Sequence, residues 1–212
     1  MAFKDTFRGD SAYSQIMTKV FDVLCLSVLC LLCCIPVITI GASVTALYYM
    51  MMKLVKNEET AVTRNFFKAF RENFVQSIPV TLILLVIMGI LFADFHILGQ
   101  SENKTSSIIY GCCVVILITA AAVFSYVFPL MARFENTIRR TLENAARLAA
   151  SHLWQTIIMV VINLFPLIWF IVSPETFSAI FWIWIFIGSG VQAFVNSLLL
   201  VKIFGRLEEE QK

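Results

Sequence analysis

Histidine and cysteine are the residues of this sequence that could do metal or redox chemistry, and their spacing argues against both. His96 and His152 are the only two histidines. Cys30-x-x-Cys33-Cys34 has the spacing of a redox or metal motif, but no histidine or second cysteine pair lies nearby at ligand spacing. No His-Glu-x-x-His, Gly-x-Ser-x-Gly, Walker or dinucleotide-binding pattern occurs. We therefore expect a protein that is not an enzyme, with no catalytic residue, no metal site and no cofactor.

Polar residues in the middle of long apolar stretches could instead bind a solute or join helices. No charged residue lies at such a position, so the sequence offers no ion path or proton relay. The uncharged polar groups found there are Thr81, Thr119, Ser125, Asn163, Gln192 and Asn196. Hydrogen bonding between helices is the first interpretation of these groups. The alternative is a polar cavity lined by Asn163, Gln192 and Asn196. Such a cavity would begin near Pro166, which frees a backbone carbonyl close to Asn163.

The elements that hold these residues are six apolar stretches. Of the 212 residues, 59% are hydrophobic and 14% charged, and the mean hydropathy is +0.85, which leaves too few polar residues to coat a soluble globule. A hydrocarbon core of about 30 Å takes roughly 20 helical residues. We therefore predict an all-α polytopic integral membrane protein, with the lipid bilayer as its solvent and a single domain over residues 1–212. The predicted transmembrane helices are 20–35, 41–55, 74–95, 108–131, 153–172 and 177–204.

The basic residues predict the topology. Of 16 Lys and Arg, 15 lie in the two terminal segments and in the second and fourth gaps between spans, and only Lys104 lies elsewhere. Cytoplasmic flanks of membrane helices retain Lys and Arg. The protein is therefore predicted to be a multi-pass plasma-membrane protein with cytoplasmic N- and C-termini and an uncleaved first span. A net charge of only +2, with basic residues beside the spans, argues against a nucleic-acid partner.

A tight helical hairpin is predicted between the first two spans. From Val23 to Met52 the sequence carries no charge, and one helix of that length would overshoot the bilayer. Pro36 removes a backbone donor and Gly41 permits a sharp turn. Thr39 is the predicted N-cap of the second helix. The sequence leaves open whether residues 36–41 form a simple turn or a gate.

An amphipathic helix is predicted between the second and third spans, in the first of the two basic gaps. Its phenylalanines recur at helical spacing and lead directly into the third span. Such a helix either lies in the lipid headgroups or docks a cytoplasmic partner, and both interpretations stay open. The candidate docking residues are Phe66, Phe67, Phe70, Phe74, Lys68 and Arg71.

The other basic gap, between the fourth and fifth spans, repeats this pattern. Its predicted apolar face holds Leu142, Ala145, Ala146, Ala149 and Leu153, and its polar face holds Arg139, Arg140, Glu143 and Arg147. This helix also leads into a span. The shared order of span, amphipathic helix and span suggests a weak internal repeat.

Two linked motifs resemble a known family. The element Pro36-Val-Ile-Thr39-Ile-Gly41 is followed by a segment that contains Asn65, Phe66, Phe67, Asn73 and Phe74. In this combination the chain resembles, over essentially its whole length, the YesL-like family of bacterial membrane proteins, catalogued as domain of unknown function 624. Members tend to be encoded beside carbohydrate-uptake transporters of the ATP-binding-cassette (ABC) type in Gram-positive bacteria. The resemblance implies an accessory or assembly role in sugar uptake, with ABC sugar-transporter subunits as partners.

Within that resemblance, the first amphipathic helix is similar to the coupling helix by which permease subunits contact their ATPase. The chain lacks the Glu-Ala-Ala-x-x-x-Gly loop of sugar permeases, which argues against direct docking to an ATPase. Two other functions stay open. One is a small independent permease, working as a homo-oligomer with Asn163, Gln192 and Asn196 along its path. The other is a membrane sensor or scaffold.

Overall fold

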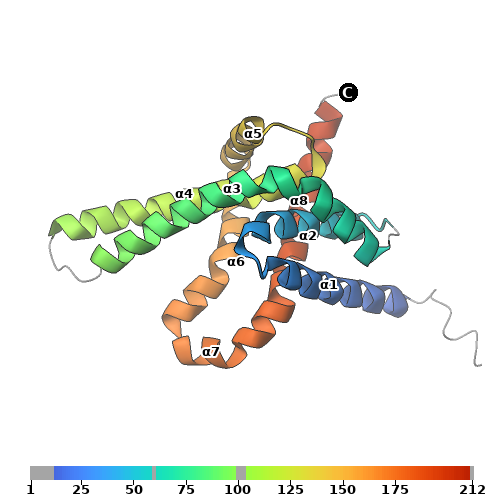
Figure 1. The fold of residues 1–212 in the computed structure, drawn as a ribbon, viewed down its shortest axis with the longest axis horizontal. Helices are drawn as coiled ribbons and strands as arrows, with labels where there is room; N and C mark the ends of the chain where they lie inside the picture. Colours follow the sequence, from blue (N-terminus) through green and yellow to red (C-terminus); the bar gives the residue numbers. More distant parts are fainter. Residues whose placement is uncertain (1–11, 59–60, 99–103, 211–212) are drawn as a thin grey trace, which may run out of the picture.

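The computed structural model describes residues 12–58, 61–98 and 104–210, and this part of the chain is almost entirely helical (Figure 1). No strand occurs among these residues. The helices are α1 (Ala12–Cys34), α2 (Ile40–Val55), α3 (Val62–Leu98), α4 (Lys104–Arg133), α5 (Ile138–Ser151), α6 (Leu153–Val172), α7 (Pro174–Ile183) and α8 (Ser189–Glu210). A 3-10 turn at Val37–Thr39 precedes α2, and a π-helical turn at Trp184–Gly188 joins α7 to α8.

Six segments are long and apolar enough to cross a membrane, as predicted. They are Ile16–Cys34, Val37–Val55, Val62–Ile97, Ile108–Arg133, Leu153–Val172 and Pro174–Arg206. The all-α polytopic membrane fold is therefore confirmed. The sixth span, predicted as one helix, consists of α7, the π-helical turn and α8.

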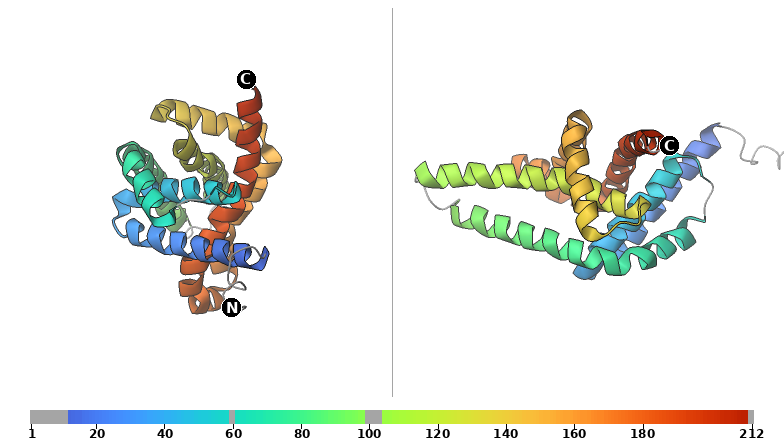
Figure 2. Two further views of the ribbon diagram at one scale, coloured as in Figure 1. Left: turned by 90° about the vertical axis from the view of Figure 1, so that its right-hand side faces the viewer. Right: turned by 90° about the horizontal axis from the view of Figure 1, so that it is seen from above.

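Helix α2 lies at the centre of the molecule and packs against α1, α3, α4 and α8 (Figures 1 and 2). Its 16 residues extend about 24 Å, less than the hydrocarbon thickness of about 30 Å. Eleven of those residues are buried, whereas the other spans expose many large apolar side chains. Asn57, with a φ of 56°, adopts the left-handed conformation just past the end of α2 and stops the helix there.

The hairpin between α1 and α2 forms as predicted, but its residues act differently. Thr39 occupies the N-cap position of α2, yet its side chain makes no capping bond. Its hydroxyl instead bonds the carbonyl oxygens of Cys33 and Pro36, which ties the end of α1 to the turn.

The predicted role of Gly41 is wrong. No described glycine has a positive φ, so Gly41 does not serve a sharp turn. A Cβ at Gly41 would overlap Thr81 Oγ1 and approach the Ser77 carbonyl oxygen to 3.1 Å. Gly41 therefore lets α2 cross α3 at close range, which is a common use of small residues between membrane helices.

Helix α3 is one continuous helix of 37 residues, whereas a separate amphipathic helix followed by a span was predicted. Pro79 removes one backbone donor inside it, and its ribbon curves along its length (Figure 2). In the other half, α5 and α6 are distinct helices separated at His152, whose φ of −117° is not helical. The two halves therefore differ at the junction between the amphipathic segment and the span, and the weak repeat stays a prediction.

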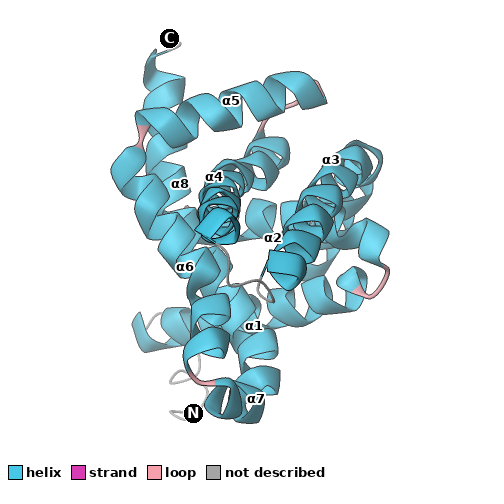
Figure 3. Cartoon of the chain, turned by 90° about the vertical axis from the view of Figure 1, so that its left-hand side faces the viewer, coloured by secondary structure: helices cyan, strands magenta, loops and turns pink. Residues whose placement is uncertain are grey.

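Two hairpins point in different directions from the centre. The α3–α4 hairpin extends to the left in Figure 1, and α6, α7 and α8 form a second hairpin whose tip, α7, lies at the bottom. Helix α5 and the end of α8 lie at the top, and the α2–α3 connection lies on the right (Figures 1 and 3). We call the top and right-hand regions together the basic end, because the helix ends and connections there hold Lys53, Lys56, Arg64, Lys68, Arg71, Arg133, Arg139, Arg140, Arg147, Lys202 and Arg206.

The close crossing at Gly41 predicts different effects for two Gly-to-Ala substitutions. Gly41→Ala forces Thr81 and α3 to shift, and overpacking of this kind costs about 1–3 kcal/mol. Gly89→Ala, also in a span, meets no atom within 4 Å and is the matched control. Thermal unfolding in mild detergent should show a lower midpoint for Gly41→Ala and an unchanged or higher midpoint for Gly89→Ala. Equal midpoints would contradict the crossing.

Candidate functional site

Five polar side chains from four helices meet in the interior, and we call them the polar cluster: Tyr48 of α2, Ser125 of α4, Asn163 of α6, and Gln192 and Asn196 of α8. Asn163 is the hub. Its Nδ2 donates to Ser125 Oγ at 2.7 Å. Its Oδ1 accepts from Gln192 Nε2 and from Asn196 Nδ2, each at 2.8 Å. One amide therefore joins α6 to both α4 and α8.

Asn196 extends the polar cluster to α2. It is fully buried, and its Nδ2 also donates to the Tyr48 hydroxyl at 3.3 Å. Its Oδ1 and the neighbouring Ser197 hydroxyl are buried with no hydrogen-bond partner in the described part of the chain. Buried polar groups that lack partners are costly in an apolar medium. A shift of α8 that broke the remaining bonds of Asn196 would therefore add to this cost.

The structure thus brings together Asn163, Gln192 and Asn196, the three residues nominated from the sequence. They bond one another across helices, which agrees with the first interpretation of such amides. The three pockets described below are lined by other residues. A solute path along this cluster stays a prediction.

Thr156 makes a second set of interhelical bonds, which the sequence gave no reason to single out. The Tyr126 hydroxyl lies 2.9 Å from Thr156 Oγ1. Thr156 Oγ1 also bonds the carbonyl oxygens of Ala149 at 3.0 Å and His152 at 2.9 Å. These contacts fix the α5–α6 junction against α4. Threonines that bond a preceding carbonyl are frequent in membrane helices, so the sequence carries no distinguishing signal.

The residues considered for metal or redox chemistry do not gather into a metal site. Cys30 Sγ and Cys34 Sγ lie 3.9 Å apart on α1, and Cys113 Sγ lies 3.7 Å from Asp94 Oδ2. No group of three or more His, Cys, Asp or Glu side chains suited to a metal occurs among the described residues. His96 lies in the last turn of α3 and His152 lies between α5 and α6.

The phenylalanine stripe at the start of α3 divides between the core and the surface. Phe66 is fully buried, so it cannot dock a partner, which corrects its predicted role. Phe67 is 46% exposed, and the half-buried rings of Phe70 and Phe74 lie 5.7 Å apart. A periodic apolar face identified the stripe but could not tell which of its members the other helices cover.

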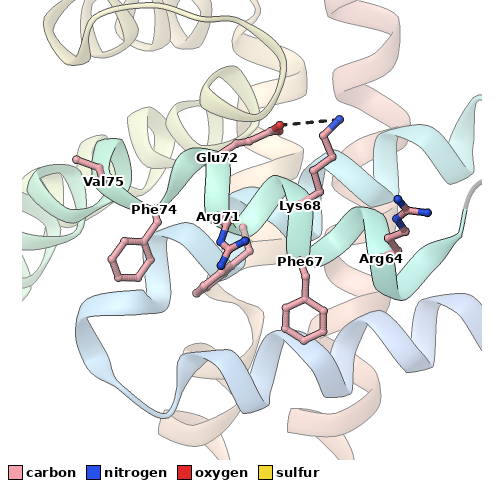
Figure 4. Close-up of a pocket in the computed structure, with 8 residues that line it drawn as sticks. Arg64, Phe67, Lys68, Arg71, Glu72, Phe74 and Val75 are labelled. Atoms are coloured by element: carbon pink, nitrogen blue, oxygen red, sulfur yellow. Dashed lines mark ion pairs between the residues drawn. The ribbon is translucent and has the colours of Figure 1, made fainter.

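A groove of about 1000 Å³ runs along this part of α3 (Figure 4). We call it the α3 groove. Its lining combines three aromatic and three basic side chains with one carboxylate and one valine: Phe67, Phe70, Phe74, Arg64, Lys68, Arg71, Glu72 and Val75. Figure 4 shows Arg71 on the side of the helix that bears Phe67, while Lys68 and Glu72 form an ion pair on the other side, at 3.9 Å.

The two asparagines of the family motif bond the backbone of α3 or of the residue just before it, and the nearby Gln76 links α3 to its neighbours. Asn73 Nδ2 donates to the Ala69 carbonyl oxygen at 2.9 Å, and the backbone N–H of Asn65, in the first turn of α3, donates to the carbonyl oxygen of Ala61. Gln76 donates to the Asn136 carbonyl oxygen and so links α3 to the α4–α5 connection.

Two further pockets open beside that connection. One, of about 980 Å³, lies between α3 and residues 134–137, and Gln76 and Arg133 are among its lining residues. A smaller one, of about 140 Å³, includes Lys53, whose ammonium lies 4.8 Å from the centre of the Tyr49 ring and 3.8 Å from Glu58 Oε2. Both belong to the basic end and are lined partly by charged groups.

Helix α5 presents a strongly basic face. Thr141, Ala145, Leu148 and Ala149 are buried, so its apolar face rests on the protein. Ala146 and Leu153, predicted on that face, are exposed. The outward residues are Arg139, Arg140, Glu143 and Arg147. Arg139 pairs with Glu143 at 2.9 Å, whereas Arg140 and Arg147 pair with no carboxylate in the described residues.

These features define a polytopic all-α membrane protein with a polar cluster inside and a basic surface at one end. Residues 23–95, from within α1 to near the end of α3, match the family model described as "Protein of unknown function, DUF624". The resemblance to the YesL-like family is therefore confirmed over this segment. No curated protein and no solved structure matches the chain.

The polar cluster predicts that Asn163 contributes more to stability than an ordinary polar residue in a span. Asn163→Leu removes three interhelical bonds and leaves the buried Asn196 amide with fewer partners, at a cost of about 1–3 kcal/mol. Thr119→Val is the control, because exposed Thr119 bonds only its own helix. Thermal unfolding in detergent should show a lower midpoint for Asn163→Leu and an unchanged midpoint for Thr119→Val. Equal midpoints would mean that the cluster does not hold the helices together.

Proposed function

We propose that this protein is a non-catalytic accessory or assembly factor for an ABC carbohydrate uptake system. In this proposal it lies in the plasma membrane with both termini in the cytoplasm, so that the basic end faces the cytoplasm. The distribution of Lys and Arg supports this orientation. The resemblance to the YesL-like family supports the link to sugar uptake.

The basic face of α5 is the observation that carries the proposal. An amphipathic helix binds a bilayer through its apolar face, but the apolar face of α5 is already covered by the protein. Its outward face is polar and held in place by the Thr156 bonds at the α5–α6 junction. A rigid polar helix at the cytoplasmic end of a membrane protein is suited to contact another protein.

The charges on α5 indicate the chemistry of that partner. Arg140 and Arg147 lie seven residues apart and therefore on one face of the helix. Neither has a carboxylate partner within the described residues, so both are available to acidic groups. Charge complementarity of this kind governs partner choice and the rate of encounter. The partner surface should be acidic and belong to a transporter subunit.

An independent permease is the second candidate, and the polar cluster is the observation that favours it. Asn163, Gln192 and Asn196 could line a path if the helices around them separate. In the structure these amides bond one another, and we therefore rank this function second. Uptake of labelled sugars into vesicles that contain only this protein separates the two functions.

The accessory function predicts a charge-dependent association. The tagged full-length protein, purified from its native membranes in mild detergent, should bring transporter subunits with it. Arg140→Glu/Arg147→Glu should lower the recovered amount about ten-fold, because attraction to an acidic surface becomes repulsion. Quantitative mass spectrometry of the purified sample measures this.

A matched control is Lys56→Glu/Lys202→Glu, which reverses two exposed charges elsewhere on the basic end. Its recovery of transporter subunits should equal that of the wild type. The proposal is refuted if the wild type is recovered alone. Equal losses of transporter subunits from both double variants would show that α5 is not the binding surface.

A further inference from the structure

The α3 groove combines an apolar floor with a basic rim in a regular pattern. Arg64, Phe67, Arg71 and Phe74 follow one another at spacings of three, four and three residues. This spacing places them along one stripe of the helix. Two cationic side chains therefore alternate with two aromatic rings over about 15 Å of helix.

The groove lies where α3 leaves the apolar part of the membrane. Residues 73–93 contain no charged residue, and their 21 positions match the roughly 20 residues that cross a hydrocarbon core. The preceding turns, from Val62 to Glu72, hold Arg64, Lys68 and Arg71 and so extend into the headgroup region. The bend that Pro79 allows lets these turns depart from the direction of the span.

Two arginines of the groove are available to a ligand. Lys68 pairs with Glu72, whereas Arg64 and Arg71 pair with no carboxylate among the described residues. Arg71 lies on the same side as Phe67 (Figure 4). A guanidinium presents several donors in a planar fork and binds phosphate through paired hydrogen bonds.

From these observations we infer that the α3 groove binds an anionic phospholipid of the leaflet at the basic end. Its phosphate lies between Arg64 and Arg71, and an acyl chain lies on the rings of Phe67, Phe70 and Phe74. A partner helix fits less well. Phe66, the first ring of the stripe, is buried in the core and is not available to a partner. The exposed Phe67 ring lies at the membrane boundary, where the neighbouring molecules are lipids. This site is separate from α5 and does not depend on the proposed function.

The test is lipid retention by the purified full-length protein. Native mass spectrometry compares phosphatidylglycerol with phosphatidylcholine of the same acyl chains. The wild type should retain phosphatidylglycerol preferentially. Arg64→Gln/Arg71→Gln should weaken its binding about 25-fold, or about five-fold for each cation removed near a membrane surface. Arg64→Lys/Arg71→Lys, which keeps the charge, should retain much of the preference.

The control is Arg140→Gln/Arg147→Gln, which removes the same charge from α5 and should leave lipid retention unchanged. Equal retention of the two lipids by the wild type overturns the inference. So does an equal loss in the control variant, because the effect would then come from net charge alone. Displacement of the lipid by inorganic phosphate would show a site for a free anion, and loss of a bound protein from Arg64→Gln/Arg71→Gln would show a protein-docking site. Either result also overturns it.

Discussion

The close crossing of α2 and α3 at Gly41 is the contact on which the rest of the structure depends. Helix α2 is surrounded by α1, α3, α4 and α8, and eleven of its 16 residues are buried. Packing around so central a helix requires that backbones approach closely, which Gly41 permits against Ser77 and Thr81. Gly190 does the same for α8 against α1, where a Cβ would overlap Ser27 Oγ. In lipid, where the hydrophobic effect does not drive helices together, such contacts supply the packing that holds them.

Hydrogen bonds then fix how the helices are placed around α2. Asn163 alone joins α4, α6 and α8, and Asn196 extends the polar cluster to Tyr48 on α2. Apolar packing tolerates a helix that rotates or slides, whereas an amide in an apolar interior loses its partners when either happens. The cluster therefore specifies one arrangement of helices. The same property would let it open a polar path if α6 and α8 moved apart, and this is why one set of residues suits both a structural and a transport interpretation.

The sequence predicted the spans well because each one leaves a local signal, an apolar run with basic residues at alternate ends. Properties that depend on distant residues were not predictable. The sequence nominated Asn163, Gln192 and Asn196 together, but it gave no sign that Asn163 would bond Ser125 on α4 or that Asn196 would bond Tyr48 on α2, 148 residues away. Burial of Phe66 depends on the helices that cover it, and the periodicity of the stripe carries no information about them. The continuity of α3 was missed because an amphipathic segment and the span after it can share one axis or be separated, as α5 and α6 are.

The two amphipathic segments of the basic end differ in what covers their apolar faces. The first turns of α3 leave Phe67 exposed at the membrane boundary, continuous with an apolar span. Helix α5 covers its apolar face with the protein and turns only charged and small residues outward. A surface of aromatic rings and arginines suits a ligand that is itself half apolar and half anionic. A surface of arginines without rings suits a solvated acidic protein. Similar sequence patterns thus support a lipid contact in one place and a protein contact in the other, and the difference lies in what covers the apolar face.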